Sequence, residues 1–326
     1  MTIASRYEAS ITPSRKTSPS SRITRSGPAA GQIALNIAAC GLNFADLLMM
    51  EGRYQDTPEP PFTLGMEVAG TVTALGPDTA GPAPGTRVAV FGGQGGLAEQ
   101  GVFQAALCRP VPAAMPSEQA AGFQVAYGTS HLALTRRARL QPGETLVVLG
   151  AAGGVGLAAV EIGKAMGARV VAVARGADKL QTARRAGADH LIDAGDDVTA
   201  RVKALGGADV VYDPVGGSAF TAALKATNRE GRIIAIGFAS GDVPQVPANR
   251  LLVKNIDVIG FYWGGYLAFA PEALTDSLAD LMGWYADGRL RPHVSHVLPL
   301  ERAADGLALI RSRRSTGKVV IVPEPA

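Results

Sequence analysis

The sequence predicts an α/β protein that joins a doubly wound parallel sheet to a smaller unit of short strands. Short apolar runs alternate with helical patterns from residue 145 to residue 261, which is typical of a parallel sheet covered by helices on both faces. Short strand patterns separated by frequent turns fill about the first 110 residues. With 326 residues, the chain is long enough for two domains.

The N-terminal part is expected to form the β-rich unit. Alternating apolar residues predict a strand over Gln32–Cys40, and a short helical stretch follows at Leu47–Met50. Further strands are expected at Met66–Leu75, Arg87–Phe91 and Val102–Leu107. The first thirty residues contain one acid and many Ser and Arg, which resembles a transit peptide. We favour a pair of edge strands there, Tyr7–Ile11 and Arg22–Thr24, because no amphipathic helical face is evident.

A helical pair broken at Gly128 is expected over Ala120–Leu134, and the parallel sheet follows it. Six strands are predicted for this sheet: Leu146–Leu149, Arg169–Ala174, His190–Ile192, Val210–Asp213, Arg232–Ile236 and Asp257–Phe261. The helices predicted between them are Leu157–Met166, Asp178–Ala186, Val198–Leu205 and Ala219–Lys225. The tail is expected to form Pro271–Ala286, Val294–Leu298, Glu301–Arg311 and Lys318–Val322.

The tail has too little core to stand apart, so we expect it to complete the N-terminal domain. The predicted domains are therefore residues 1–120 completed by residues 268–326, and residues 121–267.

A glycine turn gives the first functional signal. It lies between a buried strand and a helix, where unpaired N–H groups and the helix dipole suit a phosphate. The common G-x-G-x-x-G pattern would need a glycine at Ala151. Strand, turn, helix and strand nevertheless come in the order of a dinucleotide-binding unit, which favours that interpretation over a plain turn. The residues expected at the phosphates are Gly150, Gly153, Gly154, Val155 and Gly156.

The end of the next strand predicts the choice of cofactor. Chains that select NAD usually place Asp or Glu there to bond the ribose 2′-hydroxyl group. This chain has Arg175 at that point and Lys179 shortly after it. Two cations without a carboxylate favour the 2′-phosphate of NADPH over NADH. The alternative is a solvated Arg and Lys at the start of a helix.

Composition excludes several classes of protein. The net charge is +3 and no basic block stands out in the body of the chain, so nucleic acid is not an expected partner. Two cysteines cannot form a disulfide framework or a four-cysteine zinc site. No apolar run is long and uncharged enough to span a membrane. We expect a cytoplasmic protein with no membrane partner.

Several segments together resemble the zinc-independent quinone oxidoreductases of the medium-chain dehydrogenase/reductase superfamily. They are AACGLNFADLLMMEGRY (Ala38–Tyr54), PFTLGMEVAGTV (Pro61–Val72), VAYGTSHLAL (Val125–Leu134), LGAAGGVGLAAVEIGKAMGA (Leu149–Ala168), VVYDPVGG (Val210–Gly217), GRIIAIGFASG (Gly231–Gly241), LLVKNIDVIGFYWG (Leu251–Gly264) and TGKVVI (Thr316–Ile321). The resemblance implies a GroES-like catalytic domain and a Rossmann domain for NADPH. It also implies a turn of the form A/G-x-x-G-x-x-G, which this chain has.

The resemblance further implies that no metal is used. Zinc-dependent relatives carry Cys at the position of Asn43, and a His-Glu pair at the positions of Met66 and Glu67. An amide and a thioether do not suit zinc, which prefers thiolate, imidazole and carboxylate ligands. The four histidines are scattered among different predicted elements, so they do not suggest another metal site.

The resemblance assigns catalytic roles to three residues. Asn43 is expected to bond the nicotinamide ribose or the substrate, or else to hold a turn. Tyr54 is expected to orient a substrate carbonyl or pass a proton to it, or else to pack on the surface. Thr129 is expected beside the nicotinamide, or else as a helix cap. Further cofactor contacts are implied for Gly237, Phe238 and Lys318, although Lys318 has a surface lysine as its alternative.

The predicted function is NADPH-dependent, zinc-independent reduction of a quinone or another α,β-unsaturated carbonyl. The enzymatic alternative is an enoyl-thioester reductase of the enoyl-CoA type. The alternative from another class is a non-catalytic NADPH-binding sensor or RNA-binding protein. The resemblance also implies a homodimer, formed by sheet extension through the edge strand near Asp257–Phe261.

Overall fold

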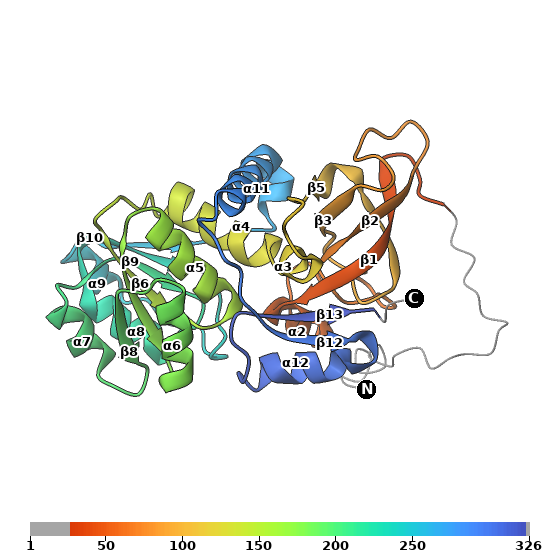
Figure 1. The fold of residues 1–326 in the computed structure, drawn as a ribbon. Helices are drawn as coiled ribbons and strands as arrows, with labels where there is room; N and C mark the ends of the chain where they lie inside the picture. Colours follow the sequence, from red (N-terminus) through yellow and green to blue (C-terminus); the bar gives the residue numbers. More distant parts are fainter. Residues whose placement is uncertain (1–26, 324–326) are drawn as a thin grey trace. The chain divides into compact units, whose positions relative to one another are not determined.

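The computed structural model describes residues 27–323, so the edge strands expected at Tyr7–Ile11 and Arg22–Thr24 lie outside the described residues. The described chain forms two compact units (Figure 1). The first unit contains the residues up to Gln124 together with those from Val294 onward. The second unit is Val125–His293.

The first unit is built on a seven-stranded sheet in the order β12-β13-β1-β2-β3-β5, with β4 paired to β1. Its strands are β1 (Gln32–Leu42), β2 (Glu67–Leu75), β3 (Arg87–Phe91), β4 (Gln100–Gln104), β5 (Cys108–Pro110), β12 (Val294–Pro299) and β13 (Lys318–Val322). Its helices are α2 (Phe44–Met50), α3 (Ser117–Ala121) and α12 (Ala303–Arg311), with 3-10 turns at Ala105–Leu107 and Leu300–Arg302. Buried residues alternate along β1, as the sequence pattern predicts for a strand with one face in the core.

Two local expectations for this region were wrong. The strand expected at Val102–Leu107 ends at Gln104, and a 3-10 turn and β5 follow it. The helical pair breaks before Gln124, where α4 (Gln124–Leu132) begins, and not at Gly128. Gly128 lies within that helix, and its lack of a side chain leaves room for Trp263, since an added Cβ would lie 2.8 Å from the indole ring.

The second unit is a doubly wound sheet of six parallel strands in the order β11-β10-β9-β6-β7-β8, as predicted. The strands are β6 (Thr145–Leu149), β7 (Arg169–Ala174), β8 (His190–Asp193), β9 (Ala208–Asp213), β10 (Thr227–Ala235) and β11 (Asp257–Gly260). The intervening helices are α5 (Gly154–Ala165), α6 (Ala177–Arg185), α7 (Val198–Ala204), α8 (Gly217–Ala226) and α9 (Ala248–Leu252).

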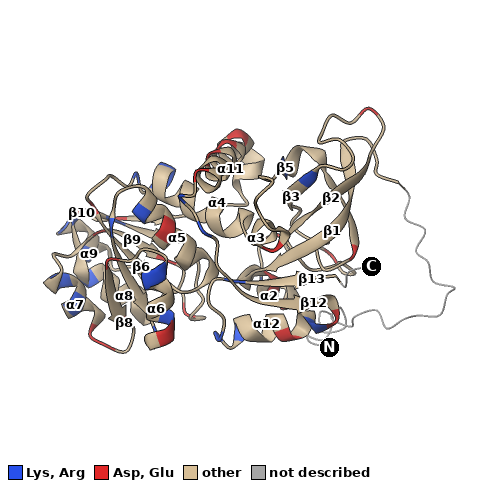
Figure 2. Ribbon diagram, in the orientation of Figure 1, with Lys and Arg blue, Asp and Glu red and all other residues tan. Residues whose placement is uncertain are grey.

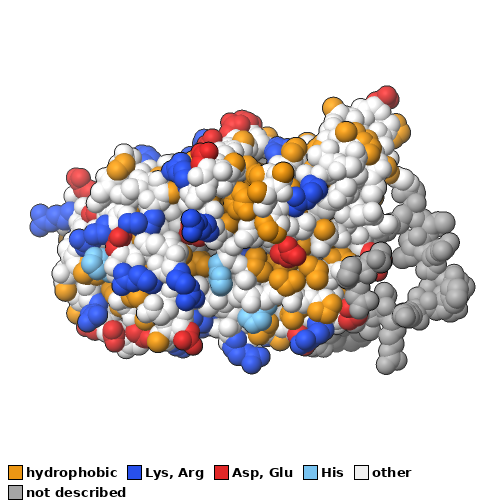
Figure 3. All heavy atoms as spheres, in the orientation of Figure 1, with side chains coloured by type: hydrophobic (Ala, Val, Ile, Leu, Met, Phe, Trp, Pro, Cys, Tyr) orange, Lys and Arg blue, Asp and Glu red, His pale blue; other side chains and the backbone are white. Residues whose placement is uncertain are grey.

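Burial explains why the second unit takes this form. Every residue of β6 is buried, so this strand lies in the core on both faces and needs an unbroken apolar run. Figure 2 shows β6 without charged residues, whereas α6 carries both acidic and basic ones. Lys and Arg side chains are spread over this face of the second unit, and acidic side chains lie among them (Figure 3).

Two further helices, α10 (Tyr266–Phe269) and α11 (Pro271–Ala286), also belong to the second unit. The sequence placed residues 268–326 with the first domain, but only those from Val294 onward group with it. Helix α11 is held in the second unit by His131 of α4. The His131 ring nitrogen Nδ1 lies 2.8 Å from Ser277 Oγ, and the ring meets Trp284 edge-on at 5.1 Å between centroids. Buried polar and aromatic contacts of this kind cannot be read from the spacing of apolar residues.

Among residues 27–323, no helix combines the length and the apolar content needed to cross a lipid bilayer.

Candidate functional site

The order of the strands in the first unit brings three distant residues together. Strand β1 lies between β2 and β13 and runs antiparallel to both. The end of β1 therefore meets the beginnings of the other two strands. Asn43 follows β1 directly, while Glu67 is the first residue of β2 and Lys318 is the first residue of β13.

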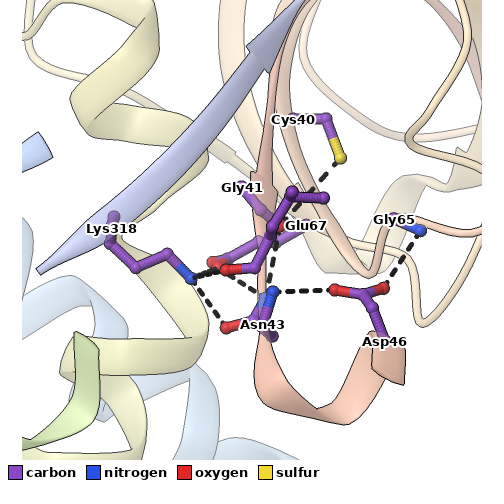
Figure 4. A network of polar contacts seen from close by, with 8 residues as sticks. Cys40, Gly41, Asn43, Asp46, Gly65, Glu67 and Lys318 are labelled. Carbon is purple, nitrogen blue, oxygen red and sulfur yellow. Dashed lines mark hydrogen bonds and ion pairs between the residues drawn. The ribbon is translucent and has the colours of Figure 1, made fainter. Parts of the chain in front are cut away.

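The three side chains form a buried hydrogen-bond network (Figure 4). The Lys318 ammonium donates to the Leu42 carbonyl oxygen at 2.8 Å, and to Asn43 Oδ1 at 2.7 Å. Its third bond goes to Glu67 Oε1 at 2.8 Å. Asn43 Nδ2 donates to the same Glu67 oxygen at 3.0 Å and to the Gly41 carbonyl oxygen at 3.3 Å.

These contacts determine the orientation of the Asn43 carboxamide. A reversed amide would set its N–H groups against the Lys318 ammonium and its oxygen against the Glu67 carboxylate. Only 9% of Asn43, 1% of Glu67 and 5% of Lys318 is exposed, so water does not screen these interactions.

A second carboxyl group, that of Asp46, braces the backbone around Asn43. It accepts the N–H of Asn43 at 2.8 Å and the N–H of Gly65 at 3.2 Å. Burial raises the pKa of the Asp46 carboxyl to about 6, although the two N–H donors and the Lys318 charge oppose the shift. Asp46 therefore connects the start of α2 to the chain that leads into β2.

Lys318 was expected near the cofactor phosphates, and its hydrogen bonds in the structure do not favour that role. All three ammonium protons are used by Leu42, Asn43 and Glu67, so none remains for a phosphate. The residue comes next to Asn43 because β13 pairs with β1, a neighbour relation that the sequence pattern does not reveal.

The remaining predicted residue of the first unit is Tyr54. It lies half-buried in the loop after α2. Its carbonyl oxygen accepts the Thr57 hydroxyl at 2.6 Å and the Thr57 N–H at 3.1 Å, which fixes a turn at this point. The backbone of Tyr54 is thus held, and the role of its phenol stays a prediction.

The glycine turn of the second unit is shaped for a ligand. Gly150 has a φ of +59°, which favours glycine, and it turns the chain from β6 toward α5. A Cβ at Gly156 would collide with the Gly150 carbonyl oxygen, so this glycine serves the packing of α5 on the turn. A Cβ at exposed Gly153 would meet only that oxygen, at 3.4 Å, so the protein itself tolerates a side chain there. The space over Gly153 suits close approach of a phosphate.

The start of α5 offers backbone donors to such a ligand. No side chain caps this helix at Gly153. The N–H groups of its first turn, which include those of Gly154 and Val155, have no carbonyl group earlier in the helix to bond to. The first turn of α5 is also supported by helix α4. Ser130, next to Thr129 on α4, donates to the Val155 carbonyl oxygen at 2.9 Å and lies 2.9 Å from the Tyr212 hydroxyl. Thr129 itself is 7% exposed.

The turn lies at the point where the strand order reverses. Strand β6 has β9 on one side and β7 on the other, and ligands of such sheets bind outside the carboxyl ends at this place. Asp213 at the end of β9 accepts the N–H groups of Val215 at 2.7 Å and Gly216 at 2.9 Å. Val215 packs against Gly150, since an added Cβ there would lie 3.0 Å from its side chain. Gly237 and Phe238 follow β10 at the same edge of the sheet, and Phe238 is 40% exposed.

The predicted cations follow β7 at the same edge. Arg175 is exposed at the end of the strand, and Lys179 is half-buried on α6. Between them, the N–H of Gly176 donates to Asp193 Oδ2 at 2.8 Å. Asp193 is the last residue of β8, so the neighbouring strand brings an acid to the end of β7.

The structure thus joins Asn43 and Lys318 in the first unit, and gathers the glycine turn, Arg175, Gly237 and Phe238 along one sheet edge in the second. The sequence patterns did not predict the supporting role of four residues, which are Glu67, Ser130, Tyr212 and Asp193. One signal was available, because Glu67 and Asp193 are acids at the ends of otherwise apolar strands. Among residues 27–323, no group of three or more His, Cys, Asp or Glu side chains is arranged to hold a metal ion.

Known proteins share this architecture. A family model described as the alcohol dehydrogenase GroES-like domain matches residues 29–113, and one described as zinc-binding dehydrogenase matches residues 154–281. The quinone oxidoreductase-like protein 2 homolog of Nematostella vectensis is 38% identical over 297 residues, which cover 89% of this chain and 81% of that protein.

Solved structures agree with this match. The quinone oxidoreductase of Thermus thermophilus, solved also as its complex with NADPH, is 34% identical with a TM-score of 0.80, over 92% of this chain and 95% of that chain. The Escherichia coli quinone oxidoreductase complexed with NADPH is 30% identical with a TM-score of 0.84, over 92% and 94% of the two chains. The chain belongs to the quinone oxidoreductase-like proteins of the medium-chain dehydrogenase/reductase superfamily, a superfamily of oxidoreductases. The predicted family and fold class are confirmed.

Proposed function

We propose that this chain is an NADPH-dependent, zinc-independent oxidoreductase that transfers hydride to a quinone or another α,β-unsaturated carbonyl. The observation that carries the proposal is the Lys318 ammonium, which is bonded to Asn43 and Glu67 at the end of β1. Zinc-dependent relatives have metal ligands at the positions of Asn43 and Met66. A buried ammonium held by Asn43 and Glu67 disfavours a second cation beside it.

The second unit supports NADPH as the cofactor. Its turn combines an uncapped helix start with open space over Gly153, which fits a pyrophosphate. Arg175 supplies a cation at the end of β7, where a 2′-phosphate is bound in this class of fold. The two similar quinone oxidoreductases were solved with NADPH. When bound, the nicotinamide supplies the hydride.

The side chains of this protein supply orientation and a proton. Both amide protons of Asn43 are used inside the first unit. Asn43 is therefore assigned an acceptor role through Oδ1, toward a ribose hydroxyl group or an amide N–H of the ligand. Tyr54 is assigned the orientation of the substrate carbonyl and the transfer of a proton to its oxygen. Thr129 is assigned a contact with the nicotinamide.

A homodimer formed by sheet extension is part of the proposal. Strand β11 is the edge strand of the six-stranded sheet, and Leu252 and Val253 on and just after the preceding helix α9 are 76% and 68% exposed. A strand edge and apolar side chains near it favour pairing with a second copy.

The proposal is tested by oxidation of NADPH and NADH with quinones, enals and enoyl thioesters as acceptors, and by metal analysis of the purified protein. We expect turnover with NADPH and a quinone or enal, and no stoichiometric zinc. Turnover confined to enoyl thioesters would assign the chain to that class of reductase. Tight NADPH binding without turnover of any acceptor would make it a nucleotide-binding protein, and bound zinc would overturn the mechanism. Asn43→Ala should lower turnover in a folded protein.

A further inference from the structure

The carboxylate of Asp193 lies at the place where selection between NADPH and NADH is expected. Strands β7 and β8 are parallel, and their register pairs Ala174 with Asp193. One carboxylate oxygen accepts the N–H of Gly176 at 2.8 Å, and the other accepts the N–H of Gly195 at 2.8 Å. The N–H of Ala194 donates to the Ala174 carbonyl oxygen at 2.9 Å, which holds the two strand ends together.

These bonds keep Asp193 ionised beside Arg175. The backbone N–H groups of Gly195 and Gly176 hold the pKa of this carboxyl below its usual range, and the Arg175 charge acts in the same direction. The side chain is half-buried at the surface of the second unit. Because its pKa lies below the usual range, it carries its negative charge at neutral pH.

The Asp193 carboxylate occupies the backbone donor of Gly176, in the turn between β7 and α6. Gly176 has a φ of +86° and precedes α6, so its N–H is one of the donors at the start of that helix. Asp193 already uses this donor. A 2′-phosphate bound by Arg175 would therefore approach a turn that already holds one anion.

We propose that Asp193 is a determinant of cofactor selectivity that acts against Arg175, so that the chain favours NADPH less strongly than Arg175 alone would dictate. The inference rests on the proposed NADPH site. A residue after β7 in the usual NAD-selecting position accepts the ribose 2′-hydroxyl group through its side chain. In this chain the acid is instead Asp193 at the end of β8. It acts on a 2′-phosphate near the end of β7 by charge repulsion.

The test compares Asp193→Asn with the unchanged protein in dissociation constants for NADPH and NADH, and for ADP-ribose with and without a 2′-phosphate. The last pair reports on the adenosine end without any turnover. Asn keeps one acceptor oxygen for the turn and removes the charge. We expect the preference for the 2′-phosphorylated ligand to rise about three- to tenfold, the size expected for removing one unit charge near a phosphate at a hydrated surface. The rise should shrink in high salt.

A matched control separates this effect from net charge. Asp196→Asn removes the same charge from the same loop, three residues on, where the side chain is exposed. An equal rise of this preference in both variants would overturn the inference. So would an unchanged preference in Asp193→Asn, provided that this variant melts like the unchanged protein. Either result would leave Asp193 as a support for the turn. If Asp193→Asn unfolds, Asp193→Ser takes its place, with the same expected rise and the same refuting result. A protein that bound neither nucleotide would overturn the proposed function, and this inference with it.

Discussion

Replacing Lys318 by Met tests the network at the end of β1 most directly. The methionine stem fills the space of the lysine stem but cannot donate to Leu42, Asn43 or Glu67. Glu67, which is 1% exposed, would lose its ion-pair partner. Breaking a buried ion pair in this way costs about 3–5 kcal/mol. Domains are stable by about 5–15 kcal/mol, so the first unit should lose a large part of its stability.

The assay must report on the first unit alone, because a chain of two units does not unfold in one step. Hydrogen exchange measured on peptides from β1 and β13 gives the free energy of opening of that part of the sheet. Arg311→Met is the matched control in the same unit. Arg311 lies 3.8 Å from Glu51 in an ion pair at the surface, with 59% and 41% of the side chains exposed, so its loss should cost about 0–1 kcal/mol.

The double variant Lys318→Met with Glu67→Gln separates charge from position. A Gln at residue 67 can still accept from Asn43, and neither member of the former ion pair is then charged. Most of the stability should therefore return, with a coupling energy of about 2 kcal/mol or more. Both Lys318→Met and the double variant should bind nucleotide more weakly than the unchanged protein, because Lys318 no longer holds Asn43 Oδ1. A loss below about 1 kcal/mol in Lys318→Met would refute the reasoning about the buried pair.

Three further predictions concern the two units separately. The folded-state pKa of Asp46 is raised from 3.8 to about 6, so its contribution is fully present below pH 3.8 and is lost as the pH rises through 6. About 3 kcal/mol of stability should therefore disappear over that window, and Asp46→Asn should abolish this slope in denaturation measured against pH. Gly153→Ala should fold normally and bind NADPH at least about tenfold more weakly. Gly156→Ala should also lower the melting temperature, because its Cβ collides with the turn. Equal melting temperatures of the two variants would contradict the packing argument. Arg175→Asp should weaken NADPH binding far more than NADH binding, and an equal loss for both would exclude the phosphate role.

Local sequence patterns were sufficient for most of the fold. Apolar runs predicted β3, β7 and β13 with the bounds that the structure has, and a strand, a turn and a helix in sequence located the nucleotide turn. These elements are specified by neighbours within a few residues, and such information is present in a single sequence. Helix α11 was also predicted with its bounds, but its assignment to the second unit depends on Ser277 and Trp284 meeting His131.

The sequence by itself determined the family, the doubly wound sheet and the presence of Asn43 and Arg175 at the ends of strands. Tertiary structure alone decided what surrounds those two residues. Lys318 and Glu67 stand 251 positions apart, and they meet because β13 and β2 flank β1. Asp193 reaches Gly176 because β8 pairs with β7. The physical reason is common to both cases: strand pairing sets the partners of a strand end, and hydrogen bonds between strands join residues without regard to their separation along the chain.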